Sequence, residues 1–532
     1  MPEENFFWAE KVAGEIAGQR KAKYVCEGGW SPSGYFHIGN FRPEIFTPYA
    51  VLLELEKIGL KASQILIVDD FDPIDKIPAG IPVPKEKEND FIGVPQALAA
   101  SPFKGYRSWA AYFESQVTDV IDDFGVKVKF ASSFKSYKSG ERNDLIKFAL
   151  NNAEAIVRVW NRVAGTDKPL SFLPVAMLCE KCGKIMFTEA LSWDSKKVSY
   201  KCKSCGFEGN APPFDGRAKL HWRVHWVANW VLNDVAFESG GKDHLSKGGS
   251  VDVGKALAIE VFNRQPPYLL PTEFVQLKGT KMSGSAGNVF GLKEWLGVAS
   301  PELFRFMFFS YKANSAIDFN LADNSFLLLN DRFERAERVF YGKEKAENEK
   351  IEAKLKTAYA LSIIGKPAKE MPLQVSYSFA VQLAQLMDLK KPDEIVNLLL
   401  KTGHAEKALS KEEKKRLLAN LRLAKNWVEK YAPAEFKVSF LERLSEGQTS
   451  AMDMPARKLL HSLAASLEKE NSAEDLQQAI YEAAKSSGVQ PKLVFKAIYL
   501  ALTGKEAGPR AGLLILAFGK ERCLKRLKEA AA

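Results

Sequence analysis

At 532 residues the chain is too long for one ordinary hydrophobic core, and its length predicts three or four domains. With 46% hydrophobic and 26% charged residues it is not a disordered chain, and no apolar run reaches the ~18 residues that a membrane helix needs. The formal net charge of +10 suits a polyanion such as nucleic acid, although a solvated basic surface accounts for it equally well. The first residues include Glu3 and Glu4 and lack the apolar segment of a signal peptide. We therefore expect a cytoplasmic protein that does not enter a membrane.

The first part of the chain alternates strand and helix signals. Short apolar runs predict strands, and apolar residues at helical spacing predict helices. A turn rich in glycine and serine, residues 27–34, separates the first strand from the first helix, which Pro48 should kink. This alternation predicts an α/β fold with a doubly wound parallel sheet of the Rossmann type. The predicted strands are residues 23–26, 64–68 and 126–130, and the predicted helices are residues 37–58 and 106–124.

Two changes of character indicate the domain organisation. Residues 165–215 hold paired cysteines and many turn formers, and after about residue 301 amphipathic helices follow one another to the end. One of these helices has a predicted start cap, Ser472 with Asp475. The predicted domains are an α/β domain at 1–300 with an inserted module at about 95–215, linker helices at 301–345, and an all-α domain at 346–532. Further elements are predicted at 220–233, 251–263, 274–277, 411–430, 456–468, 473–485 and 492–502.

The first motif that carries chemistry is SPSGYFHIGN, residues 31–40, between the first predicted strand and the first predicted helix. In an open parallel sheet, ligands bind at this edge. Gly34 and Gly39 would let a nucleotide lie close to the backbone. The helix N-terminus, His37 and Asn40 would donate hydrogen bonds to phosphate oxygens. A glycine turn with a helix-start histidine explains the same string without a ligand.

The second motif is KMSGS, residues 281–285, which follows the predicted strand 274–277. A loop of small residues with a lysine and the hydroxyls of Ser283 and Ser285 is suited to holding a phosphate that moves. The Lys281 ammonium can neutralise the charge that develops on a leaving pyrophosphate. Considered alone, the segment is equally consistent with a polar surface loop.

In this order, each beside a predicted strand, the two motifs resemble the HIGH and KMSKS signatures of class I aminoacyl-tRNA synthetases. Asn40 stands where HIGH ends in His, and Gly284 stands where KMSKS has its second Lys. Gly284 therefore removes one phosphate-binding cation, for which Lys278 can compensate. The resemblance implies ATP as a substrate. The residues implied to bind ATP are Ser33, Gly34, His37, Gly39, Asn40, Asp243, Lys281, Met282, Ser283 and Ser285.

The surrounding strings look like class I lysyl-tRNA synthetase, over residues ~20–320. They are GGWSPSG before HIGN, DDFD at 69–72, and GGKDH at 240–244. The resemblance implies that L-lysine attacks ATP, assisted by Mg²⁺, to form lysyl-adenylate, and that tRNA(Lys) then accepts the lysine. It also implies a helical C-terminal domain that binds the anticodon. The implied catalytic residues are His37, Asn40, Lys281 and Ser283. Because no exposed apolar helix seam is evident, we expect a monomer.

An acid near the substrate supports lysine as the amino acid. Glutamyl-tRNA synthetases place an arginine seven residues before the position of Gly34, where this chain has Glu27. An acid attracts a lysine ammonium and repels a glutamate side chain, whereas a strand-end carboxylate in solvent would do neither. His225 stands where an acid is expected, and Thr272 stands where an aromatic residue is expected. The residues implied to bind the amino acid are Glu27, Gly29, Ser31, Trp222, His244 and Tyr268, the last in place of the aromatic residue missing at Thr272.

Four of the six cysteines form two C-x-x-C pairs with nineteen residues between them. Two such pairs at this spacing predict one tetrahedral zinc in a zinc-ribbon module. All four ligands are protein thiolates, so no position is left for a catalytic water and the zinc is predicted to be structural. The predicted ligands are Cys179, Cys182, Cys202 and Cys205.

Three other functions remain compatible with these residues. A class I synthetase for another amino acid, glutamate first among them, would keep both motifs but is disfavoured by Glu27. A catalytically idle relative that binds RNA would not need His37 and Lys281. A nucleotidyltransferase with related motifs would in most cases lack the long helical C-terminal region.

Overall fold

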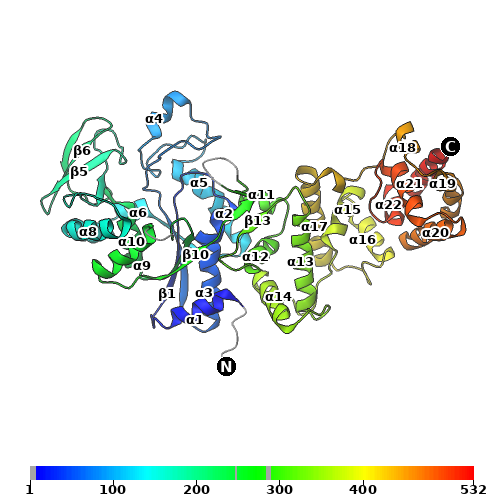
Figure 1. The fold of residues 1–532 in the computed structure, drawn as a ribbon, viewed down its shortest axis with the longest axis horizontal. Coiled ribbons are helices and arrows are strands. Elements are labelled where there is room, and N and C mark those ends of the chain that lie inside the picture. Colours follow the sequence, from blue (N-terminus) through cyan, green and yellow to red (C-terminus); the bar gives the residue numbers. More distant parts are fainter. Residues whose placement is uncertain (1–6, 246–248, 283–288) are drawn as a thin grey trace. The chain divides into compact units, whose positions relative to one another are not determined.

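The computed structural model describes residues 7–245, 249–282 and 289–532, which form two compact units (Figure 1). The first unit contains Met1–Trp295, Phe304–Phe319 and Lys345–Pro367, and the second contains Leu296–Leu303, Asn320–Glu344 and Ala368–Ala532. The chain therefore passes between the units several times after residue 295, in the region where strand signals become scarce in the sequence. The domain bounds predicted from the sequence remain predictions.

The first unit is built on a parallel sheet with the strand order β10-β9-β1-β2-β3. The chain first builds the sheet outward from β1 to β3, then returns to add β9 on the other side of β1. The direction of building changes between β1 and β9, and this is the switch point at which open parallel sheets bind ligands. The strands are β1 (Tyr24–Trp30), β2 (Ala62–Val68), β3 (Lys129–Ser132), β9 (Val235–Gly241) and β10 (Tyr268–Thr272). The predicted doubly wound fold is confirmed.

The sheet differs from the sequence prediction in its central strand. Residues 27–30 were expected in a turn, but β1 pairs with β2 along its whole length, up to Trp30 opposite Val68. The inter-strand hydrogen bonds outweigh the low strand propensity of Gly28 and Gly29. The predicted strand at 274–277 lies outside the main sheet, in a small sheet ordered β12-β11-β13. Its strands are β11 (Val275–Leu277), β12 (Thr280–Lys281) and β13 (Ile317–Phe319).

The helical segment after β1 contains a π-helical turn where a kink was expected. The segment consists of α2 (Ile38–Phe41), η1 (Arg42–Phe46) and α3 (Thr47–Lys57). Within η1, the Thr47 amide donates to the carbonyl of Arg42, five residues earlier. Pro48 has no amide hydrogen to donate, so the regular α-helical pattern is interrupted here. The wider turn brings the backbone of Glu44 against β1.

Gly28 is required by this packing. A Cβ atom at position 28 would lie 1.8 Å from the Glu44 carbonyl oxygen, a backbone atom that a rotamer change cannot move. At the neighbouring Gly29, an added Cβ would meet no atom within 4 Å. The close approach at Gly28 therefore fixes the distance between β1 and the π-turn.

An inserted region between β3 and β9 carries the paired cysteines. The buried apolar residues of this region, including those of its helices α8 and α9, form one cluster with residues of α10. Figure 1 shows these three helices grouped beside β5 and β6. Its strands are β4 (Val175–Met177), β5 (Thr188–Trp193), β6 (Val198–Cys202), β7 (Glu208–Ala211) and β8 (Ala218–Leu220). Its helices are α6 (Ser133–Lys138), α7 (Asn143–Asn151), α8 (Ala153–Ala164) and α9 (Trp222–Asn233), and α10 (Ser250–Glu260) follows β9.

The helices of the second unit follow the sequence prediction closely. The predicted helix 411–430 coincides with α17, and Ser472 caps α20 by accepting a hydrogen bond from the Asp475 amide. The helices are α13 (Ser325–Phe340), α15 (Tyr377–Leu386), α16 (Pro392–Lys401), α17 (Lys411–Lys430), α18 (Glu446–Ser450), α19 (Met454–Leu467), α20 (Ala473–Ser486), α21 (Pro491–Thr503), α22 (Ala511–Phe518) and α23 (Lys520–Ala531). The remaining helices belong mainly to the first unit and are α1 (Trp8–Ala17), α4 (Glu88–Phe91), α5 (Trp109–Thr118), α11 (Leu292–Leu296), α12 (Pro301–Phe309) and α14 (Glu349–Ser362).

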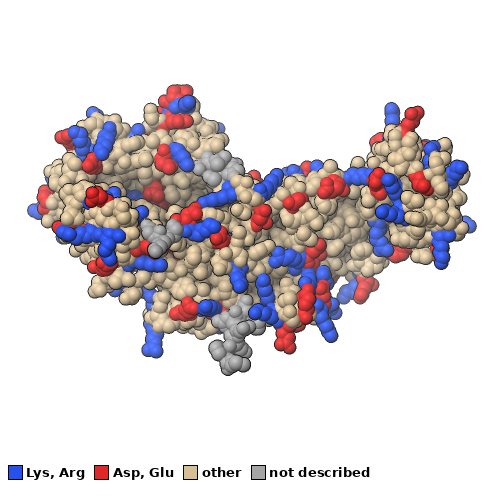
Figure 2. Space-filling view, viewed as in Figure 1, with Lys and Arg blue, Asp and Glu red and all other residues tan. Residues whose placement is uncertain are grey.

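The surface carries both charge signs. On the visible face, Lys and Arg side chains are interspersed with Asp and Glu (Figure 2). Within the described residues, no helix combines the length and the apolar character needed to cross a membrane.

The contact at Gly28 can be tested by substitution within β1. We expect Gly28→Ala to destabilise the protein by about 1–3 kcal/mol or more, because the new methyl group overpacks against fixed backbone. Gly29→Ala is the matched control and should change stability by less than about 1 kcal/mol. Thermal and urea unfolding of the two variants measure the difference. Equal stabilities would contradict the close approach.

Candidate active site

The HIGN turn forms a hydrogen-bonded cap at the start of α2. The His37 imidazole accepts from the Gly39 amide through Nδ1 at 3.1 Å, and Asn40 Oδ1 accepts from the His37 amide at 3.2 Å. An added Cβ at Gly39 would lie 2.8 Å from His37 Nδ1, so only glycine leaves room for the ring. The cap therefore orients both polar side chains that were predicted to meet phosphate.

The protonation state of His37 follows from its surroundings. Burial and the nearby Lys281 lower the pKa of His37 to about 4, so the imidazole is neutral at physiological pH. Because Nδ1 accepts a hydrogen bond, the neutral ring carries its proton on Nε2. His37 is thus a neutral hydrogen-bond donor, able to contact a phosphate oxygen but not to neutralise its charge.

The start of the KMSGS segment lies close to the HIGN turn. Met282 is buried, and its terminal methyl would lie 3.4 Å from a Cβ at Gly39. Lys281 Nζ forms an ion pair with Asp243 Oδ2 at 2.5 Å and lies 4.0 Å above the ring of Phe274. The structure thus brings together a lysine and an aspartate that were both predicted to bind ATP. Ser283, Gly284 and Ser285 lie outside the described residues.

The other predicted ATP residues border the same turn. Ser33 is exposed and Gly34 is buried, in a tight turn closed by a hydrogen bond from the Ser33 amide to the Ser31 carbonyl at 2.8 Å. Lys278, suggested as a substitute cation, is exposed at the hairpin between β11 and β12. Its φ of 54° and that of 72° at Gly279 are the positive values of a type I′ hairpin turn.

A cavity of about 490 Å³ lies at the switch point between β1 and β9. Glu27, Gly29 and Ser31, all predicted to bind the amino acid, line it together with Trp222 and His244. The cavity is lined by Glu27, Gly29, Trp30, Ser31, Asn40, Glu44, Ile67, Asp69, Asp72, Trp222, Trp226, Asn229, Glu238, Ser239, Gly240 and His244. It contains five carboxyl groups, so it suits a ligand that carries positive charge.

Three of these carboxyl groups, Glu27, Glu44 and Glu238, form no ion pair with any described residue. Glu27 accepts from Asn233 at 3.4 Å, Glu44 accepts from the Gly29 amide at 3.1 Å, and Glu238 accepts from the indoles of Trp226 and Trp230. Burial raises the pKa of Glu238 to about 7. Burial and the charge of Glu238 raise the pKa values of Glu27 and Glu44 well above the ordinary range. Their ionised forms repel one another and would be stabilised by a bound cation.

The other two carboxyl groups, Asp69 and Asp72, share one ion-pair partner. Lys219, which is buried, forms ion pairs with Asp69 at 2.8 Å and with Asp72. His225, the residue that replaced an expected acid, is also buried and lies 3.4 Å from Asp69. It bonds to the Tyr137 hydroxyl through Nδ1 at 2.9 Å. His225 therefore contacts Asp69 without lining the cavity itself, and it does not take the place of an acid within the cavity.

Aromatic rings form one wall of the cavity. The ring of His244 lies 6.0 Å from Trp222 and 5.9 Å from Trp226, and the two indoles lie 4.8 Å apart. Trp222 remains 42% exposed, and its indole donates to Ser250 at 3.2 Å. Trp222 is thus available to a ligand, whereas Trp226 is buried and holds Glu238. Rings beside carboxylates favour an alkyl chain that ends in a cation.

Tyr268 and Thr272 do not reach this cavity. They stand at opposite ends of β10, and Tyr268 lines a separate cavity with Phe7 and Trp8. Thr272 is buried and donates to the Gly240 carbonyl at 3.2 Å. The proposal that Tyr268 replaces the aromatic residue missing at Thr272 is therefore not supported, because the two residues lie at opposite ends of β10.

Sequence reasoning missed several residues of the cavity. Glu44 was hidden in a predicted helix, and Glu238 lies in a strand that was not predicted. An isolated acid within the apolar run VAFE, residues 235–238, is a signal that could have identified Glu238, since burial of an unpaired acid is costly. The other polar side chains that line the cavity and were not predicted to bind are Asp69, Asp72, Asn229 and Ser239.

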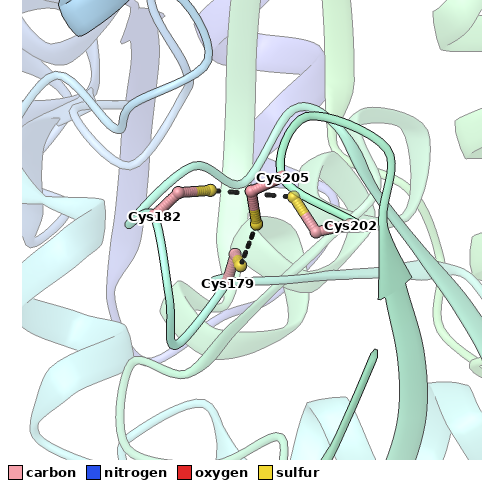
Figure 3. Close-up of side chains that lie close together, drawn as sticks. All are labelled: Cys179, Cys182, Cys202 and Cys205. Carbon is pink, nitrogen blue, oxygen red and sulfur yellow. Dashed lines mark hydrogen bonds between the residues drawn. The ribbon is translucent and has the colours of Figure 1, made fainter. Parts of the chain in front are cut away.

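The four predicted cysteines meet in one cluster, with their sulfur atoms directed toward one another (Figure 3). All four Sγ atoms lie within 4.8 Å of each other, and the closest pairs are 3.6 and 3.7 Å apart. Tetrahedral zinc with Zn–S bonds of about 2.3 Å separates its sulfurs by about 3.8 Å, so the cluster fits the ion. In each C-x-x-C knuckle, the glycine after the second cysteine has a positive φ and donates to the carbonyl of the first cysteine at 2.9 Å; these glycines are Gly183 and Gly206.

The HIGN turn follows the central strand β1, and the start of the KMSGS segment lies beside it, an arrangement that agrees with the class I aminoacyl-tRNA synthetases. The chain belongs to the family described as tRNA synthetases class I (K), whose model matches residues 6–364. A second model, described as an anticodon binding domain, matches residues 404–531. The chain is similar to the lysine–tRNA ligases of Pyrococcus horikoshii, at 34% identity, and Thermococcus kodakarensis, at 37% identity. Each comparison covers 98% of this chain and 99% of the relative.

The cavity predicts an unusual effect on stability. Glu27→Gln removes one of three mutually repelling buried carboxyl groups, so the ligand-free variant should be more stable than the parent protein. Since folding raises the pKa of Glu27, its ionisation destabilises the fold as pH rises, and the difference should grow from pH 5 to pH 8. Thermal unfolding across this range measures it, with the exposed Glu86→Gln as control. A destabilised Glu27→Gln protein at pH 8 would refute the repulsion.

Proposed function

We propose that this chain is a lysine–tRNA ligase and that the acidic cavity at the switch point binds lysine. The observation that carries the proposal is the set of three carboxyl groups, Glu27, Glu44 and Glu238, that have only neutral hydrogen-bond donors as partners in the described structure. A lysine zwitterion brings two ammonium groups to this set. Glutamate would bring a second carboxylate and would be repelled.

The residues around the cavity suggest how lysine is oriented. The backbone at Gly29 and Ser31 lies beside the HIGN turn, and the aromatic wall of Trp222 and His244 suits the aliphatic part of the side chain. In this proposal, the α-carboxylate points toward the HIGN turn, where the α-phosphate of ATP must lie. The carboxyl groups of Glu27, Glu44 and Glu238 receive the ammonium groups.

In the first step, the lysine carboxylate attacks the α-phosphate and pyrophosphate leaves, which gives lysyl-adenylate. His37 donates from Nε2 and Asn40 donates from its amide to phosphate oxygens, while Lys281 offsets the charge on pyrophosphate. Ser283 and Ser285 are proposed to assist, and Asp243 to hold the ribose. Lys281 would have to leave its ion pair with Asp243 when ATP binds. Mg²⁺ is expected to arrive with ATP.

In the second step, the terminal ribose hydroxyl of tRNA(Lys) attacks the lysyl carbonyl and AMP leaves. No protein nucleophile is required, because alignment of the two substrates supplies much of the rate enhancement. Residues 404–531 are proposed to bind the anticodon, and the cysteine cluster to hold one structural zinc. We further propose that the protein acts as a monomer in the cytoplasm.

Amino-acid-dependent exchange of pyrophosphate with ATP, measured in the presence of tRNA, tests the specificity. Among the twenty amino acids, we expect exchange with lysine. Lys281→Ala should slow the exchange by about 100-fold or more, as the loss of one charge-stabilising group does in other active sites. Lys61→Ala, an equal charge change at an exposed position just before β2, is the control. Exchange with glutamate instead would exclude our assignment of the cavity.

The pH dependence of lysine binding tests the role of the acids. Protonation of the cavity carboxyl groups removes the negative charge that attracts lysine. Since the pKa of Glu238 is about 7 and those of Glu27 and Glu44 are also raised, the KM for lysine should rise as pH falls from 8 to 6. The KM for ATP should change much less. Glu238→Gln should raise the KM for lysine and flatten this profile. A lysine KM independent of pH would contradict the model of binding.

Metal analysis tests the cysteine cluster. Protein purified without chelators should contain about one zinc per chain, and Cys182→Ser should lose the metal and unfold the module between β4 and β8. Cys523→Ser, at a buried cysteine outside the cluster, is the control that should retain the zinc. Retention of zinc by Cys182→Ser would disprove a four-cysteine site.

A further inference from the structure

A second polar cavity lies within the helical unit, far along the sequence from the synthetase motifs. It has a volume of about 230 Å³ and lies where α15 and α16 meet the first turns of α20 and α22. This volume is below the about 300–1,000 Å³ of sites for drug-sized ligands, so the cavity suits a single ring system. It is lined by Ser376, Ser378, Phe379, Gln382, Thr402, His404, Ala473, Glu474, Arg510 and Leu513.

Two stacked rings form one side of this cavity. The His404 imidazole lies parallel to the ring of Phe379, with centroids 4.0 Å apart and planes inclined by 22°. Phe379 is buried, whereas His404 is exposed. The pair therefore forms a platform with a buried base and an accessible upper ring, to which a further planar group can be added.

The backbone holds His404 in this position. Gly403 follows the end of α16 with a φ of 67°, and the His404 amide donates to the Leu399 carbonyl at 2.9 Å, which closes the helix end. His404 Nδ1 lies 2.8 Å from the Thr402 hydroxyl. The ring is thus presented to the cavity in a fixed orientation, and no contact of its Nε2 atom with another described residue is seen.

The opposite side of the cavity is also rigid. A Cβ at Gly512, in the first turn of α22, would lie 2.0 Å from the Ala473 carbonyl of α20. The Gly512 amide donates to Gln477 at 3.1 Å. This packing places Arg510, directly before α22, beside the first turn of α20. The site is therefore preformed on both sides.

Three polar side chains at the cavity suit the edge of a nucleobase and its phosphate, and the carboxylate of Glu474 lines the cavity as well. Gln382 offers both an amide donor and an acceptor, Ser378 offers a hydroxyl, and neither has a hydrogen-bond partner in the described part of the chain. Arg510 has no carboxylate partner there either. Its planar guanidinium can donate two hydrogen bonds to one phosphate group. Unpaired RNA bases are bound by stacking together with hydrogen bonds to their edges.

We propose that this cavity binds one unstacked base of tRNA, which lies on His404 while Arg510 contacts a neighbouring phosphate. This proposal rests on the proposed function, because it assumes that tRNA is the partner. The helical unit as a whole is proposed to bind the anticodon. The cavity would be one defined subsite within it, with an aromatic platform and a polar edge.

Binding of tRNA transcripts tests the subsite. The transcripts carry a single abasic nucleotide at each position of the anticodon loop in turn. Because one stacked base contributes about 1–3 kcal/mol, we expect one abasic position to weaken binding to the parent protein about 5- to 150-fold. His404→Ala should weaken the binding of intact tRNA comparably and should lose its sensitivity to that abasic position. His404→Phe, which keeps a ring, should restore both properties.

The controls separate this subsite from general charge effects and from the proposed function. Arg510→Ala should weaken binding, whereas Lys485→Ala, an equal charge change at the far end of α20, should not. If His404→Ala binds intact tRNA as the parent does, or keeps every abasic penalty unchanged, the subsite is refuted. Lysine-dependent aminoacylation by the parent protein is measured separately, and its absence would refute the proposed function and not the binding of a base.

Discussion

The contact between Gly28 and the carbonyl of Glu44 determines the geometry on which the acidic cavity depends. It joins the central strand of the sheet to the π-turn at the point where the helix passes closest to β1. Because position 28 carries no side chain, Glu44 comes near enough for its carboxylate to accept the Gly29 amide. The same approach sets the HIGN turn, which begins this helical segment, at a fixed distance from the cavity. The absence of a side chain at position 28 thus connects the acidic cavity with the HIGN turn.

The cavity is arranged so that its charge is only partly neutralised. Lys219 forms ion pairs with two of the acids, Asp69 and Asp72, whereas Glu27, Glu44 and Glu238 have no ion-pair partner in the described structure. Three buried carboxyl groups that repel one another reduce the stability of the ligand-free protein. A ligand with two ammonium groups removes most of this repulsion. In the proposed model, the preference for a cationic amino acid and the cost of burying these three acids have the same electrostatic origin, a trade of stability for function.

The two motifs proposed to bind phosphate differ in what they can supply. His37 is held neutral by burial and contributes a donor with a fixed tautomer, whereas Lys281 contributes charge. The two motifs are far apart in the sequence, but the fold brings them together, because Met282 lies against Gly39. Lys281 forms an ion pair with Asp243, a residue that is also proposed to bind ATP.

The sequence alone determined those features whose cause is local. Glycine and proline positions, the C-x-x-C spacing, the apolar period of α17 and the cap at Ser472 all act within a few residues, so the cysteine cluster, the start of the helix at HIGN and the helical region were predicted well. The tertiary structure decided what depends on partners distant in sequence. It extended β1 through residues 27–30 because β2 pairs with them, and it placed β11 in a separate sheet. It brought Glu44 and Glu238 to Glu27, and it placed Tyr268 at the opposite end of β10 from Thr272. Burial and charge repulsion arise only when such segments meet, which is why the acids of the cavity could not be assembled from the sequence.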